Sequence, residues 1–272
     1  MKYIFLIIIF LSVSLFAYED TDMDGVEDSL DKCPNTLITD LVDINGCTKK
    51  SLVSPHHFDI IVGSSYSQVD YNTFEKTDSL AGTLQVDYYY KNFSLQAATS
   101  YFNSDSPSYT NSGMNDSFIA TYYQFRPLTN FSFRLGAGVV LPTYDSGLNN
   151  NYTDYAAILS FSYSLKYMNI FGGYSFTLVN DEDIDTVDTY VKYQDINSFY
   201  GGLGFYPSSN LYMSASYNST DSIYVGVETI QSASIYTYYG IDEHWFSTFS
   251  YAYGLSDSAS NHSASIRIGY YF

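Results

Sequence analysis

The last eleven residues, 262–272, read HSASIRIGYYF, and they decide the fold expected for this chain. Apolar side chains occupy every second position, at Ala264, Ile266, Ile268, Tyr270 and Phe272. The positions between them are mostly polar, at Ser263, Ser265, Arg267, Gly269 and Tyr271. Because a strand points alternate side chains to opposite faces, this segment predicts a strand with one apolar and one mostly polar face.

The same alternation recurs through the preceding two hundred or so residues, in segments of about ten residues, the length that a tilted strand needs to cross a bilayer. Apolar positions are expected to face outward and polar positions inward. The expected strands are 58–67, 78–90, 93–102, 116–125, 131–141, 154–165, 169–178, 196–206, 211–218, 231–240, 245–254 and 262–272.

Short and long connections alternate between these segments, which predicts an all-β, antiparallel up-and-down barrel of about twelve strands. An even number of strands leaves both chain ends on the side of the short turns, which is periplasmic in this class. Residues 179–195 and 219–230 also contain β-forming side chains, so fourteen strands is the alternative.

The C-terminal pattern resembles the closing strand of a bacterial outer-membrane β-barrel. That resemblance implies that Tyr270 and Phe272 form the signal read by the barrel-assembly machinery. It also implies that the outer surface meets outer-membrane lipid and lipopolysaccharide. A dense acidic stretch at 180–185, NDEDID, is expected in a long extracellular loop, where it either binds divalent cations beside lipopolysaccharide or is simply solvated.

Composition supports this class. Hydrophobic residues make up 46% of the chain, yet past the N-terminus no apolar run approaches the roughly 20 residues of a spanning helix. The 31 tyrosines and 19 phenylalanines suit aromatic girdles better than the alternative of a soluble β-sandwich or propeller. The net charge of −18 argues against nucleic-acid binding, which needs clustered Lys and Arg.

Residues 1–17, MKYIFLIIIFLSVSLFA, read as a Sec-type signal peptide, with one Lys before a short apolar stretch and cleavage expected after Ala17. No Cys follows that position, so a lipoprotein anchor is not indicated. Export makes a disulfide the expected state of Cys33 and Cys47. In the chain-entropy model, a loop of this size contributes about 3 kcal/mol.

Residues 18–50 carry carboxylates at calcium-ligand spacing. Counting Asp20 as position 1, acidic side chains fall at positions 1, 3, 5, 9 and 12, with glycine at 6 and a backbone carbonyl ligand at 7. This is the spacing by which an EF-hand-like loop wraps Ca²⁺ with hard oxygen ligands. The expected ligands are Asp20, Asp22, Asp24, the Val26 carbonyl, Asp28 and Asp31.

The whole segment resembles a bacterial thrombospondin type 3 repeat, in DTDMDGVEDSLDKCPNT at 20–36 followed by VDINGC at 42–47. It departs from that family at Leu37, Ile38 and Thr39, where Pro-x-Gly is more usual. The repeat is expected to be periplasmic and to precede a linker at 51–57 and the barrel at 58–272. As a single copy, it is expected to bind Ca²⁺ weakly, with a dissociation constant near ~10⁻⁴ to 10⁻³ M.

Three charged residues fall at positions expected to face the barrel interior and are the candidate lumen residues: Asp87, Arg134 and Arg267. The segments that hold Asp87 and Arg267 flank the first strand of the expected barrel, which suggests an internal ion pair. Catalysis is not expected, because His262 and its neighbour Ser263 would face opposite sides of one strand. The functional expectation is a passive porin-like channel for small polar solutes, or a structural barrel. The alternative is a surface adhesin or receptor that the barrel only anchors.

Overall fold

The computed structural model describes residues 22, 26, 28, 31–36, 45, 47, 56–70, 75–145, 152–185 and 190–272. The chain divides into two compact units, Met1–Leu52 and Val53–Phe272. The expected signal peptide and its cleavage site at Ala17 lie outside the described residues, as do Asp20 and Asp24. No helix long and apolar enough to cross a membrane occurs in the described ranges.

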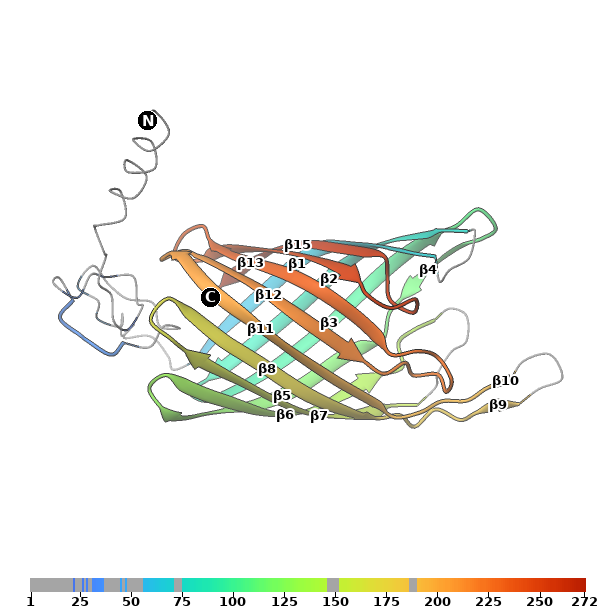
Figure 1. Ribbon diagram of the computed structural model, residues 1–272, viewed down its shortest axis with the longest axis horizontal. Helices are drawn as coiled ribbons and strands as arrows, with labels where there is room; N and C mark the ends of the chain where they lie inside the picture. The colour runs from blue at the N-terminus through green and yellow to red at the C-terminus, as the bar shows by residue number, and fades with distance from the viewer. Residues whose placement is uncertain are drawn as a thin grey trace, which may run out of the picture. The chain divides into compact units, whose positions relative to one another are not determined.

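The second unit is a closed antiparallel barrel of twelve long strands (Figure 1). These strands are β1 (His56–Val69), β2 (Thr77–Tyr90), β3 (Phe93–Asp105), β5 (Ser117–Leu128), β6 (Phe131–Leu141), β7 (Asp154–Ser164), β8 (Met168–Leu178), β11 (Ile196–Ser208), β12 (Leu211–Thr220), β13 (Ile230–Gly240), β14 (Trp245–Gly254) and β15 (His262–Tyr271). Each pairs with its neighbours in chain order, and β1 pairs with β15 to close the ring. Closure removes the unpaired edges that an open sheet would expose.

Three short strands lie in the long connections. β4 (Thr110–Met114) continues the ladder on β3 beyond the point where β5 begins. β9 (Ile184–Asp185) and β10 (Tyr190–Val191) pair with each other in the connection between β8 and β11, drawn far out in Figure 1. The β-forming residues of 179–195 therefore extend a hairpin, and the barrel has twelve strands rather than fourteen.

The expected strands agree closely with the observed ones, and two short turns are tighter than expected. β5 and β11 each run past the expected end and carry a register shift, between Phe125 and Leu128 and between Phe205 and Ser208. Pro127 and Pro207 lie within those shifts. Proline has no N–H to donate to a ladder, so the strand bulges at proline and then resumes pairing.

The outer surface is apolar and layered. An aliphatic band runs around its middle, at Ile60, Val62, Leu84, Val86, Leu95, Ile119, Leu135, Leu159, Ile170, Leu203, Ile235 and Ile268, all substantially exposed. Exposed aromatic rings flank the band toward the short turns, at Phe93, Tyr123, Phe125, Tyr163, Phe205, Tyr239, Trp245 and Phe272. A second aromatic girdle flanks it toward the long loops, at Tyr66, Tyr101, Tyr155, Tyr174, Phe199, Tyr217 and Tyr253. An apolar band between two aromatic girdles is the surface of a barrel that spans a bilayer.

Candidate functional site

The barrel interior is the candidate site, and its two ends differ. We call the half nearer the short turns the short-turn half and the other the long-loop half. Inward rings of the short-turn half form what we call the aromatic belt, made of Tyr89, Tyr122, Tyr206, Tyr212, Tyr236, Tyr238, Phe246 and Tyr271. The inward charged residues Asp59, Asp87, Arg134 and Arg267 lie among these rings.

Arg134 on β6 is held against the wall by two neighbouring strands. Its guanidinium lies 3.8 Å from the ring centroid of Tyr122 on β5, a cation–π contact. Its Nη2 also donates a hydrogen bond of 2.8 Å to the hydroxyl of Ser94 on β3. The expected lumen residue Arg134 is therefore fixed in place by packing and hydrogen bonding.

Asp87 and Arg267 lie on the two strands that flank β1, as expected, but a third side chain joins them. Gln85 donates through Nε2 to Asp87 Oδ2 at 2.7 Å and accepts through Oε1 from Arg267 Nη1 at 3.1 Å. The expected direct ion pair is thus replaced by a relay through an amide. Gln85 can serve both partners because a carboxamide carries a donor and an acceptor.

Asp59 is an inward carboxylate that the sequence interpretation missed. It is the cross-strand partner of Asp87 in the β1–β2 ladder, and both side chains are buried. The Tyr89 hydroxyl hydrogen-bonds to Asp59. The sequence could have indicated this residue, because Asp59 falls on the polar, inward-facing positions of the expected strand 58–67.

The belt residues contact one another across strands. The hydroxyls of Tyr238 and Tyr271 lie 2.9 Å apart, and both rings pack on Phe246, with centroid distances of 5.4 and 4.6 Å. On the neighbouring wall, Tyr212 packs on Tyr206 and donates a 3.3 Å hydrogen bond to Asn169 Oδ1. These contacts join β13, β14 and β15 in one group, and β8, β11 and β12 in another, from the inside.

Two glycines let belt rings lie flat on the wall. A Cβ on Gly269 would come within 2.1 Å of the Phe246 ring, and a Cβ on Gly136 within 2.4 Å of the Tyr122 ring. Any side chain at either position would push the ring toward the lumen. The inward glycines therefore help to decide how far the belt projects into the barrel.

The long-loop half has a different lining, built from small hydroxyl side chains. Serine hydroxyls pair across neighbouring strands at Ser216–Ser234 (2.8 Å), Ser250–Ser265 (2.7 Å) and Ser79–Ser104 (2.6 Å). Asn218 adds a 3.0 Å hydrogen bond to Ser234. These groups satisfy one another along the wall, so the polar lining does not require a plug to supply partners.

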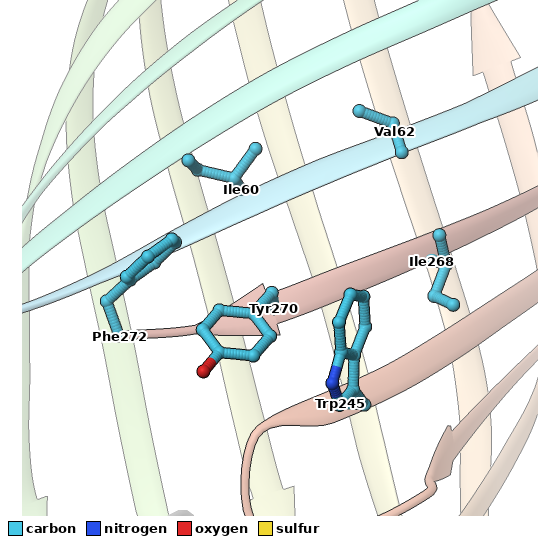
Figure 2. Close-up of a pocket in the computed structure, with 6 residues that line it drawn as sticks. All are labelled: Ile60, Val62, Trp245, Ile268, Tyr270 and Phe272. Atoms are coloured by element: carbon cyan, nitrogen blue, oxygen red, sulfur yellow. The ribbon is translucent and has the colours of Figure 1, made fainter.

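The C-terminal aromatics lie on the outside of the barrel. Tyr270 packs between Trp245 and Phe272, with ring-centroid distances of 4.8 and 4.7 Å, and Figure 2 shows these rings beside β1. They line a shallow apolar hollow of about 400 Å³ together with Ile60, Val62 and Ile268. The Phe272 amide also donates to the Phe58 carbonyl at 2.9 Å, which extends the β1–β15 seam to the last residue.

The histidines contact aromatic groups. His262 hydrogen-bonds through Nδ1 to the Tyr251 hydroxyl at 2.8 Å and packs near Tyr253. His244, in the turn before β14, lies 3.2 Å from the Tyr271 carbonyl and stacks on Tyr270. These contacts hold each ring against the barrel surface.

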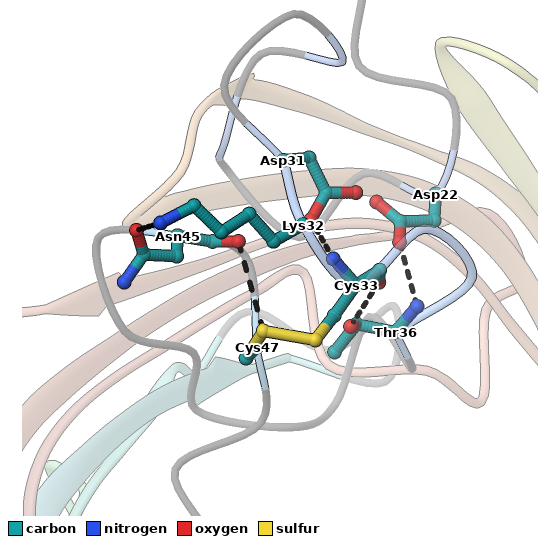
Figure 3. Close-up of a disulfide and its surroundings, with 7 residues drawn as sticks. All are labelled: Asp22, Asp31, Lys32, Cys33, Thr36, Asn45 and Cys47. Atoms are coloured by element: carbon teal, nitrogen blue, oxygen red, sulfur yellow. Dashed lines mark hydrogen bonds between the residues drawn. A yellow bond between two sulfur atoms is a disulfide. The ribbon is translucent and has the colours of Figure 1, made fainter.

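The N-terminal unit contains the expected disulfide between Cys33 and Cys47, with Cα atoms 4.9 Å apart. Figure 3 shows the hydrogen bonds around it. The Thr36 amide donates to Asp22 Oδ2 at 2.6 Å, and the Cys33 amide donates to Asp31 Oδ1 at 2.8 Å. Lys32 bonds Asn45 through both its backbone and its side chain, which adds to the link that the disulfide makes.

Four expected calcium ligands, Asp22, Val26, Asp28 and Asp31, are among the described residues. Within the described part of the chain, no three His, Cys, Asp or Glu side chains converge on one point. Asp20 and Asp24 would complete the set and lie outside that part. Carboxylate and carbonyl oxygens are the donors that Ca²⁺ prefers, so the donor chemistry fits this ion.

Solved structures share this barrel fold. An outer membrane channel from Pseudomonas putida F1 matches with a TM-score of 0.68 and 10% identity, over 85% of this chain and 100% of that chain. The NanC porin matches with a TM-score of 0.54 and 13% identity, over 78% and 98% of the two chains. The KdgM porin matches with a TM-score of 0.53 and 11% identity, also over 78% and 98%. No protein-family model and no curated protein matches the sequence. At these identities the likeness establishes the porin-like β-barrel fold.

Proposed function

We propose that this protein is a passive outer-membrane channel for small polar solutes. The observation that carries the proposal is the division of side chains between the two faces of a closed barrel. The outer face presents an aliphatic band between two aromatic girdles, and the inner face of the long-loop half presents paired hydroxyls. A polar lining is favourable only where water or a polar solute occupies the lumen.

The short-turn half would set the width and charge of the passage. One belt ring, Tyr206, remains 37% exposed although it faces inward, so it borders open space inside the barrel. The inward charges Asp87, Arg134 and Arg267 are fixed to the barrel wall by the contacts described above. Sieving by width and fixed charge requires no covalent step.

Planar-bilayer recording tests this proposal. The purified protein, with folding confirmed by heat-modifiable gel migration, should give discrete and reproducible steps of conductance. Liposomes that contain it should swell in small sugars and not in large dextrans. A folded protein that gives neither conductance nor swelling would contradict the channel and leave the barrel as an anchor for an adhesin or receptor.

We also propose that residues 20–31 bind one Ca²⁺ ion on the periplasmic side. The support is the spacing of oxygen donors, next to the Cys33–Cys47 disulfide and the hydrogen bonds between Lys32 and Asn45. Calcium would supply the positive charge that the acidic loop needs in order to pack. Asp22, Asp28 and Asp31 are the described carboxylates that would hold it.

Isothermal titration of the full-length mature chain tests the calcium proposal. Wild-type protein should bind Ca²⁺ with heat that Asp22→Ala removes. Asp257→Ala changes an exposed acid in a long loop and serves as the matched control, with binding retained. Equal heats for wild type and Asp22→Ala would rule this loop out as the site.

A further inference from the structure

Two apolar hollows lie on the outer surface, one on each side of β1. The first hollow, of about 400 Å³, lies between β1, β14 and β15, and Figure 2 shows the rings of Trp245, Tyr270 and Phe272 at one end of it. The second hollow, of about 480 Å³, lies between β1, β2 and β3 and is lined by Phe58, Val86, Tyr88, Leu95 and Ala97. Both volumes fall within the range of small-ligand sites, about 300–1,000 Å³.

The strand register places the two hollows side by side, in the half of the barrel nearer the short turns. Ile60 of the first hollow pairs with Tyr270 on one side and with Val86 of the second hollow on the other. Val86 pairs in turn with Ala97 on β3. The outward side chains of β1 therefore form a ridge between the hollows, and Ala97 gives the second one a short wall.

Shape is what distinguishes these hollows from the rest of the outer surface. The aliphatic band and the aromatic girdles place this surface in the bilayer, where the surrounding solvent is lipid. Lipid tails are as apolar as the protein wall, so burial of apolar area gives no preference for one place on it. A hollow surrounds an acyl chain on more sides than a flat wall does and so makes more dispersion contacts with it.

Polar donors lie at the short-turn edge of the second hollow. The exposed Lys91, in the β2–β3 turn, places Nζ 5.3 Å from the Tyr90 ring centroid. The exposed His56 stacks on Tyr90 at 4.7 Å, and its Nδ1 hydrogen-bonds with the hydroxyl of Tyr88, which lines the hollow. An ammonium and an imidazole at the level of the lipid headgroups can bind a phosphate.

The other edge of the pair of hollows has the opposite charge. Asp242 lies in the turn before β14, and its Oδ1 accepts the backbone amides of His244 and Trp245. Glu243 lies in the same turn. An anionic phosphate is therefore attracted to the Lys91 edge and repelled from the Asp242 edge.

We propose that these hollows bind one phospholipid of the leaflet next to the short turns. One acyl chain lies in each hollow, on either side of the β1 ridge, and the phosphate contacts Lys91 and His56. The bound lipid covers the pairing of β1 with β15 that closes the barrel. Because the site is on the outer surface, it does not depend on whether the lumen conducts.

Trp245 supplies the probe for this site, because it is the one tryptophan in the chain and lines the first hollow. Its fluorescence is quenched on contact with brominated acyl chains. Full-length mature protein is titrated with dibrominated phosphatidylethanolamine in a large excess of maltoside detergent, where random contact with a brominated chain is rare. Quenching in the wild type should saturate at one phospholipid per protein.

Filling the second hollow should weaken binding that is read out in the first. Ala97→Phe places a ring in the second hollow and should remove the saturable quenching, although Trp245 itself is unchanged. Ala157→Phe makes the same substitution at an exposed position of β7, away from both hollows, and should keep it. Heat-modifiable gel migration confirms that each variant is folded.

The phosphate contact has its own pair of variants. Lys91→Gln should weaken phospholipid binding about fivefold, the effect of one lysine charge at a lipid surface. It should not change the binding of dibrominated diacylglycerol, which has the same chains and no phosphate. Lys166→Gln changes a lysine that lies 5.4 Å from the Tyr167 ring in the β7–β8 turn, and should leave phospholipid binding unchanged.

Three results would overturn the proposal. Quenching that rises in proportion to the lipid-to-detergent ratio without saturating would show random contact only. Equal saturable quenching in wild type and Ala97→Phe would show that the second hollow holds no chain of the same lipid. Equal affinity for phospholipid and diacylglycerol would show that the phosphate is not bound.

Discussion

The two halves of the barrel interior are built from the same strands but by different means. The short-turn half is lined by large rings and charges that lock together, as Arg134 does on Tyr122 and Ser94. The long-loop half is lined by small hydroxyls that bond in pairs, as Ser216 does with Ser234. The difference teaches that large side chains pack and hold one another in the short-turn half, whereas the wall of the long-loop half carries small polar groups.

The largest effect should come from disturbing the belt at its closest contact. Gly269→Ala places a methyl group where the Phe246 ring now lies, 2.1 Å from the nearest ring carbon. Overpacking of this kind costs about 1–3 kcal/mol, so urea unfolding in detergent should shift to lower concentration. Gly82→Ala is the control, because a Cβ there meets nothing within 4 Å. Equal unfolding of the two variants would show that the belt is loosely packed.

Removal of the fixed arginine should have the next largest effect. Arg134→Gln loses the contact over Tyr122 and weakens the bond to Ser94, which should cost about 2 kcal/mol by the same unfolding assay. Arg126→Gln alters an exposed arginine near the end of β5 and should change stability little. If both substitutions are neutral, the short-turn half is not held together by its charges.

The paired hydroxyls of the other half should contribute less individually. Ser250→Ala removes one partner of the 2.7 Å pair with Ser265 and should cost about 1 kcal/mol or less. Ser247→Ala, on the opposite face of β14, is the matched control and should be nearly neutral. A loss for Ser250→Ala as large as that for Arg134→Gln would erase the distinction between the halves.

The smallest effect should come from the turn before β14, outside both halves. Asp242 Oδ1 accepts the backbone amides of His244 (2.8 Å) and Trp245 (2.7 Å), and these bonds hold the pKa of the exposed carboxyl below its usual range. Because the folded-state pKa lies below the ordinary value of about 3.9, the ionised carboxyl stabilises the folded state at pH values above 3.9. That stability is lost as the pH falls through the folded-state pKa. Asp242→Ala should therefore unfold slightly earlier than wild type at pH 7, and the gap should narrow in strong acid. A gap that is independent of pH would contradict the role of the charge.

The strands could be predicted from sequence to within three residues at each end, because alternation is a local property. Segments 131–141 and 245–254 coincide with β6 and β14. The extension of β5 beyond Pro127 was not foreseen, because proline usually ends a strand, and here the strand bulges and continues. The short strand β4 was also missed, since its pairing depends on the shape of the long loop around it.

The interior network could be predicted only in part. Parity placed Asp87, Arg134 and Arg267 inside, and strand order placed Asp87 near Arg267. The alternation of inward and outward positions does not say which side chains meet. It therefore could not predict the link through Gln85 or the contact of Arg134 with Ser94. Because tyrosine occurs on both faces of this barrel, the number of tyrosines alone could not predict the aromatic belt inside it. The Cys33–Cys47 disulfide was predicted correctly, because export and close spacing allow one pairing.

The most direct test of the account is single-channel conductance of two neighbouring variants of β11. Tyr206 faces inward within the belt, whereas Phe205 faces outward and is 45% exposed. The account predicts larger conductance steps for Tyr206→Ala than for wild type, because a ring that borders the lumen is removed. It predicts unchanged steps for Phe205→Ala. A folded Tyr206→Ala barrel with wild-type conductance would contradict the claim that the short-turn half sets the width of a passage.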